Sequence, residues 1–198
     1  MIWTLFDYGV GNLHSLQKAL QRAGAETQIT DDPNVLADAD VAVLPGVGAF
    51  GHVMERLAPA AEALRQRHRD GRPMLGICIG MQALYESSDE ADVPGLGILP
   101  GRVTRLPASA GKVPHMGWNT LDDATGLAAQ ATGHVYYVHS YAAAPDAHST
   151  ATTNYGQPFS AALEAGNTVA FQFHPEKSGP VGAAILAATV KQLEAACN

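Results

Sequence analysis

Apolar strand-like runs alternate with helical patterns from the amino terminus of this sequence, and this alternation is the strongest constraint on its fold. It predicts an α/β protein built on an open, mostly parallel sheet with helices on both faces. We find no internal repeat, low-complexity tract or flexible linker, so residues 1–198 are expected to form one domain. The expected strands are 3–6, 26–29, 41–44, 74–77 and 169–173, and the expected helices are 13–23, 52–70 and 181–193.

The segment from residue 93 to residue 167 has a different pattern. Pro and Gly interrupt short strand-like runs there, among them 135–138, and few helical periods occur. We therefore expect an antiparallel extension of the sheet. In parallel sheets, functional residues gather just beyond the carboxyl ends of strands, so these ends are where candidates are expected.

Composition and charge exclude several classes of protein. The apolar fraction of 46% and the charged fraction of 16% are typical of a soluble globular protein, and no apolar run approaches the ~18 residues of a membrane span. The formal net charge of -7, with scattered Lys and Arg, disfavours a nucleic-acid partner. Only Cys78 and Cys197 are present, which predicts no disulfide framework or CxxC metal site and favours a reducing cytoplasm. The amino terminus does not resemble a secretory signal, and Cys197 is interpreted as an ordinary free thiol.

The most specific local motif is GICIG at residues 76–80, between the expected strand 74–77 and a helical stretch at 81–87. It has the form of a nucleophile elbow, a strained turn from strand to helix in which flanking glycines leave room for neighbouring chain. At a helix amino terminus, backbone N–H groups favour the thiolate, which is the attacking species. The alternative is that Cys78 is a small buried hydrophobic residue, and the two glycines favour the nucleophile.

Two further strand ends carry candidate groups. His174 and Glu176 follow the strand 169–173, and such a carboxylate can hold an imidazole tautomer and stabilise the imidazolium. The alternative is a structural His beside a surface Glu. After the strand 41–44, the loop of Gly46, Val47 and Gly48 can direct backbone N–H groups at an oxyanion and so form an oxyanion hole together with the N–H of Ile79. The alternative is an ordinary strand-to-helix turn that binds no ligand.

These motifs, in this order and spacing, resemble the class I (triad) glutamine amidotransferases, whose fold is an open α/β sheet. Within that family they look like glutaminase subunits of a synthase in histidine biosynthesis. The resemblance covers nearly the whole chain, with Ile79 standing where Leu is usual. The motifs are DYGVGNLHS at 7–15, LPGVGAF at 44–50, GICIGMQ at 76–82, KVPHMGWN at 112–119, VHSY at 138–141 and QFHPEKS at 172–178.

The resemblance implies that Cys78 attacks the side-chain amide of glutamine, that His174 is its base and acid, and that Glu176 orients the imidazole. The ammonia released would pass to a cyclase subunit with a (β/α)8 barrel, in a heterodimer that needs no metal or organic cofactor. Glutamine would be bound by Gly46, Val47, Gly48, Ile79, Gln82, His139, Ser140 and Tyr141. The partner would be faced by Asn12, Trp118, Tyr136 and Lys177, for which core packing of the aromatic rings and a solvated charge are the alternatives.

Two other functions remain open. The chain could supply ammonia to another synthase, such as anthranilate synthase, because the triad does not identify the acceptor; the motif KVPHMGWN argues against this. It could instead be a catalytically silent regulator on the same fold, because fold does not imply function. The presence of Cys78, His174 and Glu176 argues against a silent protein.

Overall fold

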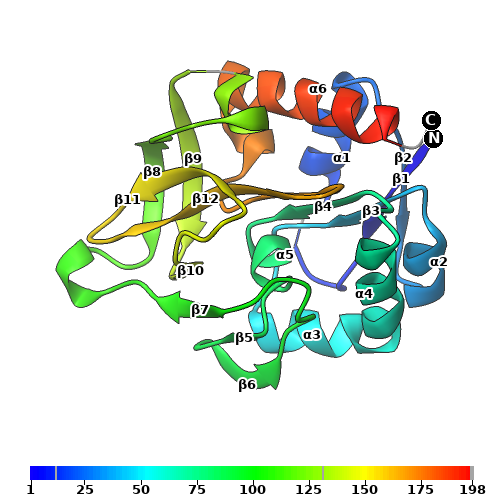
Figure 1. Cartoon of the computed structure of the whole chain (residues 1–198), viewed down its shortest axis with the longest axis horizontal. Coiled ribbons are helices and arrows are strands. Elements are labelled where there is room, and N and C mark those ends of the chain that lie inside the picture. Colours follow the sequence, from blue (N-terminus) through cyan, green and yellow to red (C-terminus); the bar gives the residue numbers. More distant parts are fainter. Residues whose placement is uncertain (12, 131, 197–198) are drawn as a thin grey trace.

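The centre of the molecule is a seven-stranded sheet, seen in a computed structural model that describes residues 1–11, 13–130 and 132–196 (Figure 1). Its strands are β1 (Ile2–Phe6), β2 (Glu26–Thr30), β3 (Val41–Leu44), β4 (Met74–Ile77), β11 (Ser149–Asn154), β12 (Pro158–Ala165) and β13 (Thr168–Phe171). Their order is β11-β12-β13-β4-β3-β1-β2. The strands from β13 to β2 pair in parallel, whereas β11 and β12 pair antiparallel at one edge. The mostly parallel sheet and its antiparallel extension are thus confirmed.

Helices cover both faces of this sheet (Figure 1). Helices α1 and α6 share one hydrophobic cluster with the sheet, and α2 to α5 share the other. Asn12 and Cys197, discussed above, lie outside the described residues. No helix within the described ranges has the length and apolarity needed to cross a membrane. The helices are α1 (His14–Arg22), α2 (Pro33–Asp38), α3 (Phe50–Leu57), α4 (Ala61–Arg69), α5 (Ile79–Gln82) and α6 (Gly179–Ala195).

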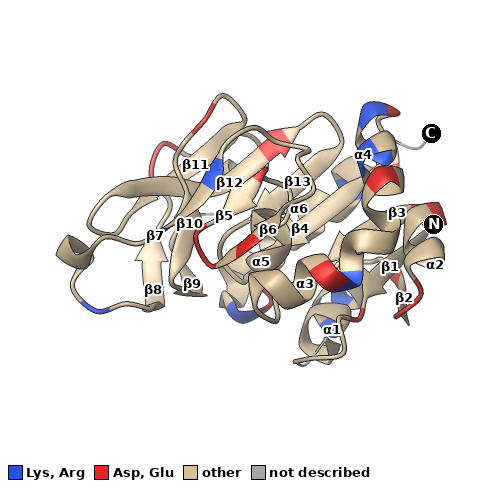
Figure 2. Ribbon diagram, turned by 90° about the horizontal axis from the view of Figure 1, so that it is seen from below, with Lys and Arg blue, Asp and Glu red and all other residues tan. Residues whose placement is uncertain are grey.

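Two smaller sheets extend from the main one. The first has the order β10-β7-β5-β6, and the second is a ribbon of β8 and β9 in which Trp118 lies opposite Tyr136. Figure 2 shows no Lys, Arg, Asp or Glu along either strand of this ribbon. Their strands are β5 (Ser87–Ser88), β6 (Ala91–Pro94), β7 (Arg102–Arg105), β8 (His115–Thr120), β9 (His134–His139) and β10 (Tyr141–Ala143).

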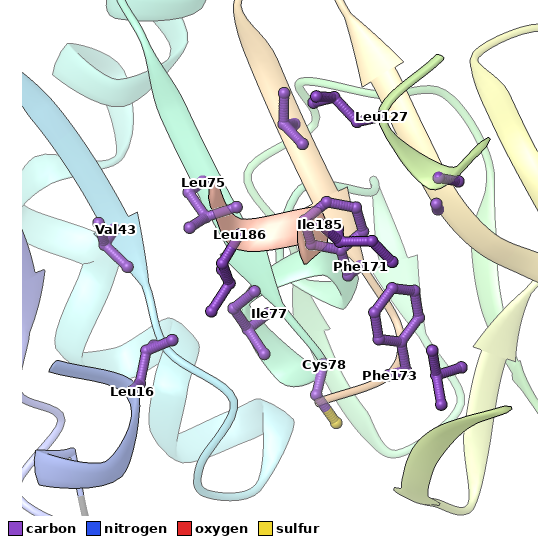
Figure 3. Close-up of a cluster of buried hydrophobic side chains, with 14 of the residues drawn as sticks. Leu16, Val43, Leu75, Ile77, Cys78, Leu127, Phe171, Phe173, Ile185 and Leu186 are labelled. Atoms are coloured by element: carbon purple, nitrogen blue, oxygen red, sulfur yellow. The ribbon is translucent and has the colours of Figure 1, made fainter. Parts of the chain in front are cut away.

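Alternation along the central strands divides the core between the two faces. On β3, Val43 belongs to the cluster with α1 and α6, whereas Leu44 belongs to the cluster with α2 to α5. Figure 3 shows Ile77 of β4 in the first cluster, with Cys78 at the end of the same strand and Phe173 close by. The nucleophile candidate therefore lies at the end of a strand that is buried in the core.

The expected helix at 52–70 is wrong, because two helices occupy this segment. Helix α3 ends at Leu57, a 3-10 turn spans Ala58–Ala60, and α4 begins at Ala61. Pro59 lies in that turn, and a proline inside a helix removes one backbone hydrogen bond and clashes with the preceding turn. Helix α2 was not anticipated, although Asp32 caps it by accepting a hydrogen bond from the Asn34 N–H at 2.8 Å.

The helical stretch expected after Cys78 is also wrong in length, because α5 ends at Gln82. The chain beyond it bonds to a neighbouring segment instead of continuing the helix. The Leu96 N–H donates to the Ala83 carbonyl at 2.8 Å, and the Ile98 N–H donates to the Leu84 carbonyl at 2.9 Å. With only one turn of helix, few aligned peptide dipoles act on the thiol.

Candidate active site

Three neighbouring strands, β3, β4 and β13, end at the same edge of the sheet and bring the candidate groups together. Gly46 follows β3, Cys78 follows β4 and His174 follows β13. A Cβ atom added to Gly46 would lie 2.8 Å from Cε1 of His174 and 3.0 Å from Cβ of Cys78. All three residues therefore converge on one point, as the strand-end argument predicted.

The turn at Cys78 has the strained geometry of a nucleophile elbow. Cys78 has φ +48° and ψ -107°, which L-residues rarely adopt, and its N–H donates to the Phe171 carbonyl at 2.7 Å. A Cβ atom at Gly80 would overlap the carbonyl oxygen of Leu44, and one at Gly76 would lie 3.0 Å from the carbonyl of Gly80. Both flanking glycines are thus required by close approach of backbone, as the elbow motif predicted.

His174 and Glu176 form a buried pair beside the thiol. Nδ1 of His174 lies 2.7 Å from Oε1 of Glu176, and the two side chains are 3% and 7% exposed. Burial alone would lower the pKa of His174, but the Cys78 thiolate and the Glu176 carboxylate outweigh it and raise that pKa to about 10. Nε2 of His174 has no hydrogen-bond partner among the described residues. The imidazole is therefore held through Nδ1, with Nε2 left to exchange a proton.

The backbone of His174 is anchored to the β8–β9 ribbon. Its N–H donates to the Tyr136 carbonyl at 2.9 Å, and its carbonyl accepts from Oγ of Ser178 at 2.7 Å. Oγ of Ser178 in turn accepts from the Tyr136 N–H at 2.9 Å. Strand β9 thus fixes the position of the imidazole.

A cavity of about 290 Å³ opens in front of Cys78 and His174. Most of the expected glutamine-binding residues line it, and Lys177, expected at the partner interface, lines it as well. Val47 does not line it, because its side chain packs against Gly11, where an added Cβ would lie 2.7 Å away. The lining residues are Gly46, Gly48, Cys78, Ile79, Gln82, Glu90, Pro114, Val138, His139, Ser140, Tyr141, His174 and Lys177.

The wall of this cavity is braced by neutral histidines. His139 and His115 are buried, and burial lowers the pKa of His139 to about 3 and that of His115 to about 4. Nδ1 of His139 lies 2.9 Å from the Tyr141 carbonyl, so this nitrogen carries the proton and Nε2 is an acceptor. Nδ1 of His115 lies 3.0 Å from that Nε2 and donates to it. The expected pocket residues His139 and Tyr141 are thereby locked to each other.

Two residues of the site were missed from the sequence. Glu90 lines the cavity, and its Oε2 accepts a hydrogen bond from the Phe50 N–H at 3.2 Å. Gln172 is buried, and its Nε2 lies 3.6 Å from the sulfur of Cys78. Gln172 carries a signal in the sequence, since alternation along an extended strand puts it on the same side as His174 and opposite Phe173. Glu90 carries none, because it lies in the turn between the short strands β5 and β6, which no sequence pattern predicted.

Trp118 and Tyr136, expected at the partner interface, lie on the β8–β9 ribbon, and Val138 and His139 of the same ribbon line the cavity. Trp118 on β8 is 56% exposed and its ring contacts that of half-buried Tyr136 edge-on, with centroids 5.9 Å apart. Met116, on the same strand, is 63% exposed, so this face of the ribbon is apolar and open. Core packing, the alternative considered for Trp118, is excluded by its exposure. Asn12 lies outside the described residues, so its role stays a prediction.

The chain matches the family described as glutamine amidotransferase class-I over residues 4–193, and it belongs to that family. Solved structures agree on the fold. A structure described as a glutamine amidotransferase has a TM-score of 0.73 at 18% identity, covering 98% of each chain. The PurLQS structure from Thermotoga maritima has a TM-score of 0.69 at 19% identity, covering 97% of this chain and 98% of the other. At this identity the likeness bears on the fold alone.

Among curated proteins, the similar relatives have a more specific description than the family. The imidazole glycerol phosphate synthase subunit HisH of Halobacterium salinarum is 48% identical over 193 residues, covering 91% of this chain and 88% of the relative. The protein of the same name from Mycobacterium tuberculosis is 46% identical over 202 residues, covering 96% and 97%. The chloroplastic imidazole glycerol phosphate synthase hisHF of Arabidopsis thaliana is 45% identical over 92% of this chain, which matches 33% of the longer relative.

Proposed function

We propose that this chain is the glutaminase subunit of imidazole glycerol phosphate synthase, acting as one domain. Its support is the near full-length identity to relatives of that name, together with the meeting of Cys78, His174 and Gly46 at one sheet edge. The subunit hydrolyses glutamine to glutamate and passes ammonia to a cyclase partner. The partner uses that ammonia to convert a formimino aminoimidazole carboxamide ribonucleotide into imidazole glycerol phosphate and an aminoimidazole carboxamide ribonucleotide.

The geometry of the His174–Glu176 pair and of the elbow at Cys78 supports the following catalytic cycle. The Cys78 thiolate attacks the side-chain amide carbon of glutamine, and N–H groups at Val47 and Ile79 stabilise the oxyanion. His174, held as the imidazolium by Glu176, protonates the amide nitrogen of the tetrahedral intermediate, and the carbon–nitrogen bond breaks to release ammonia. Water then hydrolyses the thioester and releases glutamate. His174, once deprotonated, serves as the base in this second half.

Residues that line the cavity would orient the glutamine substrate. Glu90 is the carboxylate among the described residues lining the cavity, and we assign it to the α-ammonium group of glutamine. Gln82, His139, Ser140 and Tyr141 bound the remainder of the pocket. No metal or organic cofactor takes part in this scheme.

The partner is assigned to the apolar face of the β8–β9 ribbon. Exposed Trp118 and Met116 offer the aromatic and sulfur-containing anchors common in protein interfaces. The face also leads directly to the site, because Tyr136 contacts Trp118 and its carbonyl accepts the His174 N–H. The Arabidopsis relative supports a joint function, since there the matching region is one third of a longer synthase chain. We assign the barrel form of the partner, the heterodimer and the cytoplasm by the same resemblance.

Regulation by the partner is part of this proposal. A glutaminase that ran without an acceptor would waste glutamine, so we infer that the loop at Gly46, Val47 and Gly48 completes the oxyanion site only when the loaded partner is bound. Completing one oxyanion donor would raise turnover by roughly 10²- to 10³-fold.

A coupled assay tests this function. Purified chain is assayed for glutamine hydrolysis alone, with the cyclase subunit and its nucleotide, and with an anthranilate synthase partner as the control. The proposal predicts that the cyclase with its nucleotide strongly stimulates glutamine hydrolysis and that the anthranilate synthase partner does not. Stimulation by the anthranilate synthase partner, or no hydrolysis under any condition, would refute it in favour of the other synthase or of a silent regulator.

A further inference from the structure

A continuous array of buried side-chain amides ends at the reactive sulfur. Gln82 is 3% exposed and Gln172 is 1% exposed. Nε2 of Gln82 lies 2.8 Å from the Tyr141 carbonyl and 3.0 Å from Oε1 of Gln172, whose own Nε2 lies 3.6 Å from Sγ of Cys78. Buried amides need partners for their donors, and here one of those partners is the nucleophile itself.

The direction of these hydrogen bonds is fixed by their chemistry. The Tyr141 carbonyl can only accept, so Gln82 must present its NH₂ group to it. The second N–H of that group then needs an acceptor, which is Oε1 of Gln172. The NH₂ group of Gln172 is consequently turned toward Cys78, so that an N–H donor rather than a carbonyl oxygen faces the sulfur.

The anchor of this array is itself locked. The Tyr141 carbonyl also accepts from Nδ1 of His139, whose Nε2 accepts from His115, and both rings are kept neutral by burial. Gln82 is therefore bonded to a rigid carbonyl, and Gln172 is bonded to a positioned amide. Such preorganised donors stabilise charge without reorganising during the reaction.

We propose that Gln172 is a further catalytic residue, which donates a hydrogen bond to the Cys78 thiolate, and that Gln82 is the positioning residue that orients it. This deepens the proposed function by assigning a donor to the reacting atom. The need for such a donor follows from the fold, because α5 has only one turn and contributes little dipole at the sulfur.

The donor acts at two points of the cycle. Before attack it stabilises the thiolate that forms the bond to the amide carbon. When water opens the thioester, the carbon–sulfur bond breaks with its electron pair on sulfur, and the same N–H stabilises the leaving thiolate. Hydrogen bonds to charged groups are the strong ones, and losing one corresponds to roughly ten- to hundredfold in rate.

The test measures the pH dependence of thiol alkylation by iodoacetamide, with the whole chain in a Cys197→Ser background. Gln172→Met removes the donor and keeps the length, whereas Gln172→Glu keeps the acceptor for Gln82 and places oxygen opposite the sulfur. Both should move the midpoint of alkylation to higher pH, the Glu variant further, and lower the rate at pH 7 roughly ten- to hundredfold. Gln28→Met, on the exposed edge strand β2, is the matched control and should leave the profile unchanged.

Folded variants, judged by thermal unfolding, whose alkylation profiles match wild type would overturn the proposal, because a purely structural role changes stability and not the profile. The unsubstituted residue gives a second measurement: the side-chain NH₂ resonances of Gln172 should shift in NMR spectra with the midpoint of alkylation. Resonances that do not move would equally overturn it. The two proposals fail separately. Unchanged alkylation profiles would overturn the role of Gln172 but not glutamine hydrolysis by the wild-type complex, and a negative coupled assay would overturn the proposed function but would not affect the alkylation measurement.

Discussion

Adding one methyl group at Gly46 should separate the nucleophile from its base. The added Cβ would lie 2.8 Å from Cε1 of His174, 3.0 Å from Cβ of Cys78 and 3.1 Å from Cγ2 of Ile77. Reaching an ordinary 3.4 Å contact with the imidazole requires a shift of 0.6 Å (3.4 minus 2.8), shared among side chains that are all buried. A misplacement of about 1 Å costs roughly 10²-fold in rate, so Gly46→Ala should lower kcat/KM by about ten- to a hundredfold.

The same substitution should leave the fold in place. Gly46 does not have a positive φ, so alanine can adopt its backbone, and overpacking of this kind costs about 1–3 kcal/mol. Gly51→Ala is the matched control: its Cβ would meet only Ala91 at 3.3 Å, and alanine is favoured over glycine inside α3. Steady-state glutaminase kinetics of the partner complex and denaturant unfolding measure both effects. If folded Gly46→Ala has the kcat/KM of the wild type, the claim that activity depends on the close approach of the three strand ends is refuted.

Three other predictions follow from the site. Val47→Pro removes an N–H and restrains φ, so it should abolish stimulation by the partner while the thiol still reacts with iodoacetamide; full stimulation would refute the oxyanion role of the loop. Glu176→Gln removes one cause of the raised pKa of His174, which is about 10, so NMR titration should show this imidazole deprotonating at lower pH, and an unchanged titration would contradict the prediction. The ion pair stabilises the fold fully below pH ~6.5, and this stabilisation is lost as pH rises through the folded pKa. In the variant it should therefore be lost at a lower pH than in the wild type. Burial lowers the pKa of His115 to about 4 and that of His139 to about 3, so only the unfolded state binds these protons as pH falls below ~6.5. The free energy of unfolding should therefore drop by up to about 1.4 kcal/mol per pH unit for each ring. In denaturant titrations, His115→Asn should show a smaller drop with falling pH than the wild type, and an equal slope would contradict the prediction.

The middle of the central sheet was predictable because β1, β3, β4 and β13 are short, mostly apolar runs. The bounds of β3 and β4 agree with those expected from the sequence, and the elbow and the His-Glu pair follow directly from the ends of such strands. Local signals also existed for α2, where Asp32 and Pro33 form a capped helix start. The break at Pro59 likewise follows from a local rule that helical periodicity alone does not express.

The rest depends on contacts between distant segments. Helix α5 ends early because Ala83 and Leu84 bond to residues 96–99, and no pattern within the helical stretch itself announces that. Glu90 enters the cavity through the path of the small sheet that follows α5. The donor role of Gln172 requires knowing that Gln82 and the Tyr141 carbonyl meet it, and these three residues come from separate parts of the chain.

The most direct test of the account is to remove the nucleophile while keeping the complex. Cys78→Ser is combined with the cyclase subunit, and synthesis is measured with glutamine and, separately, with ammonium salt as the nitrogen source. The account predicts that glutamine-dependent synthesis falls by several orders of magnitude while ammonia-dependent synthesis stays at the wild-type rate, and that adding His174→Ala causes little further loss. Wild-type synthesis from glutamine in Cys78→Ser would contradict the assignment of Cys78 as the nucleophile.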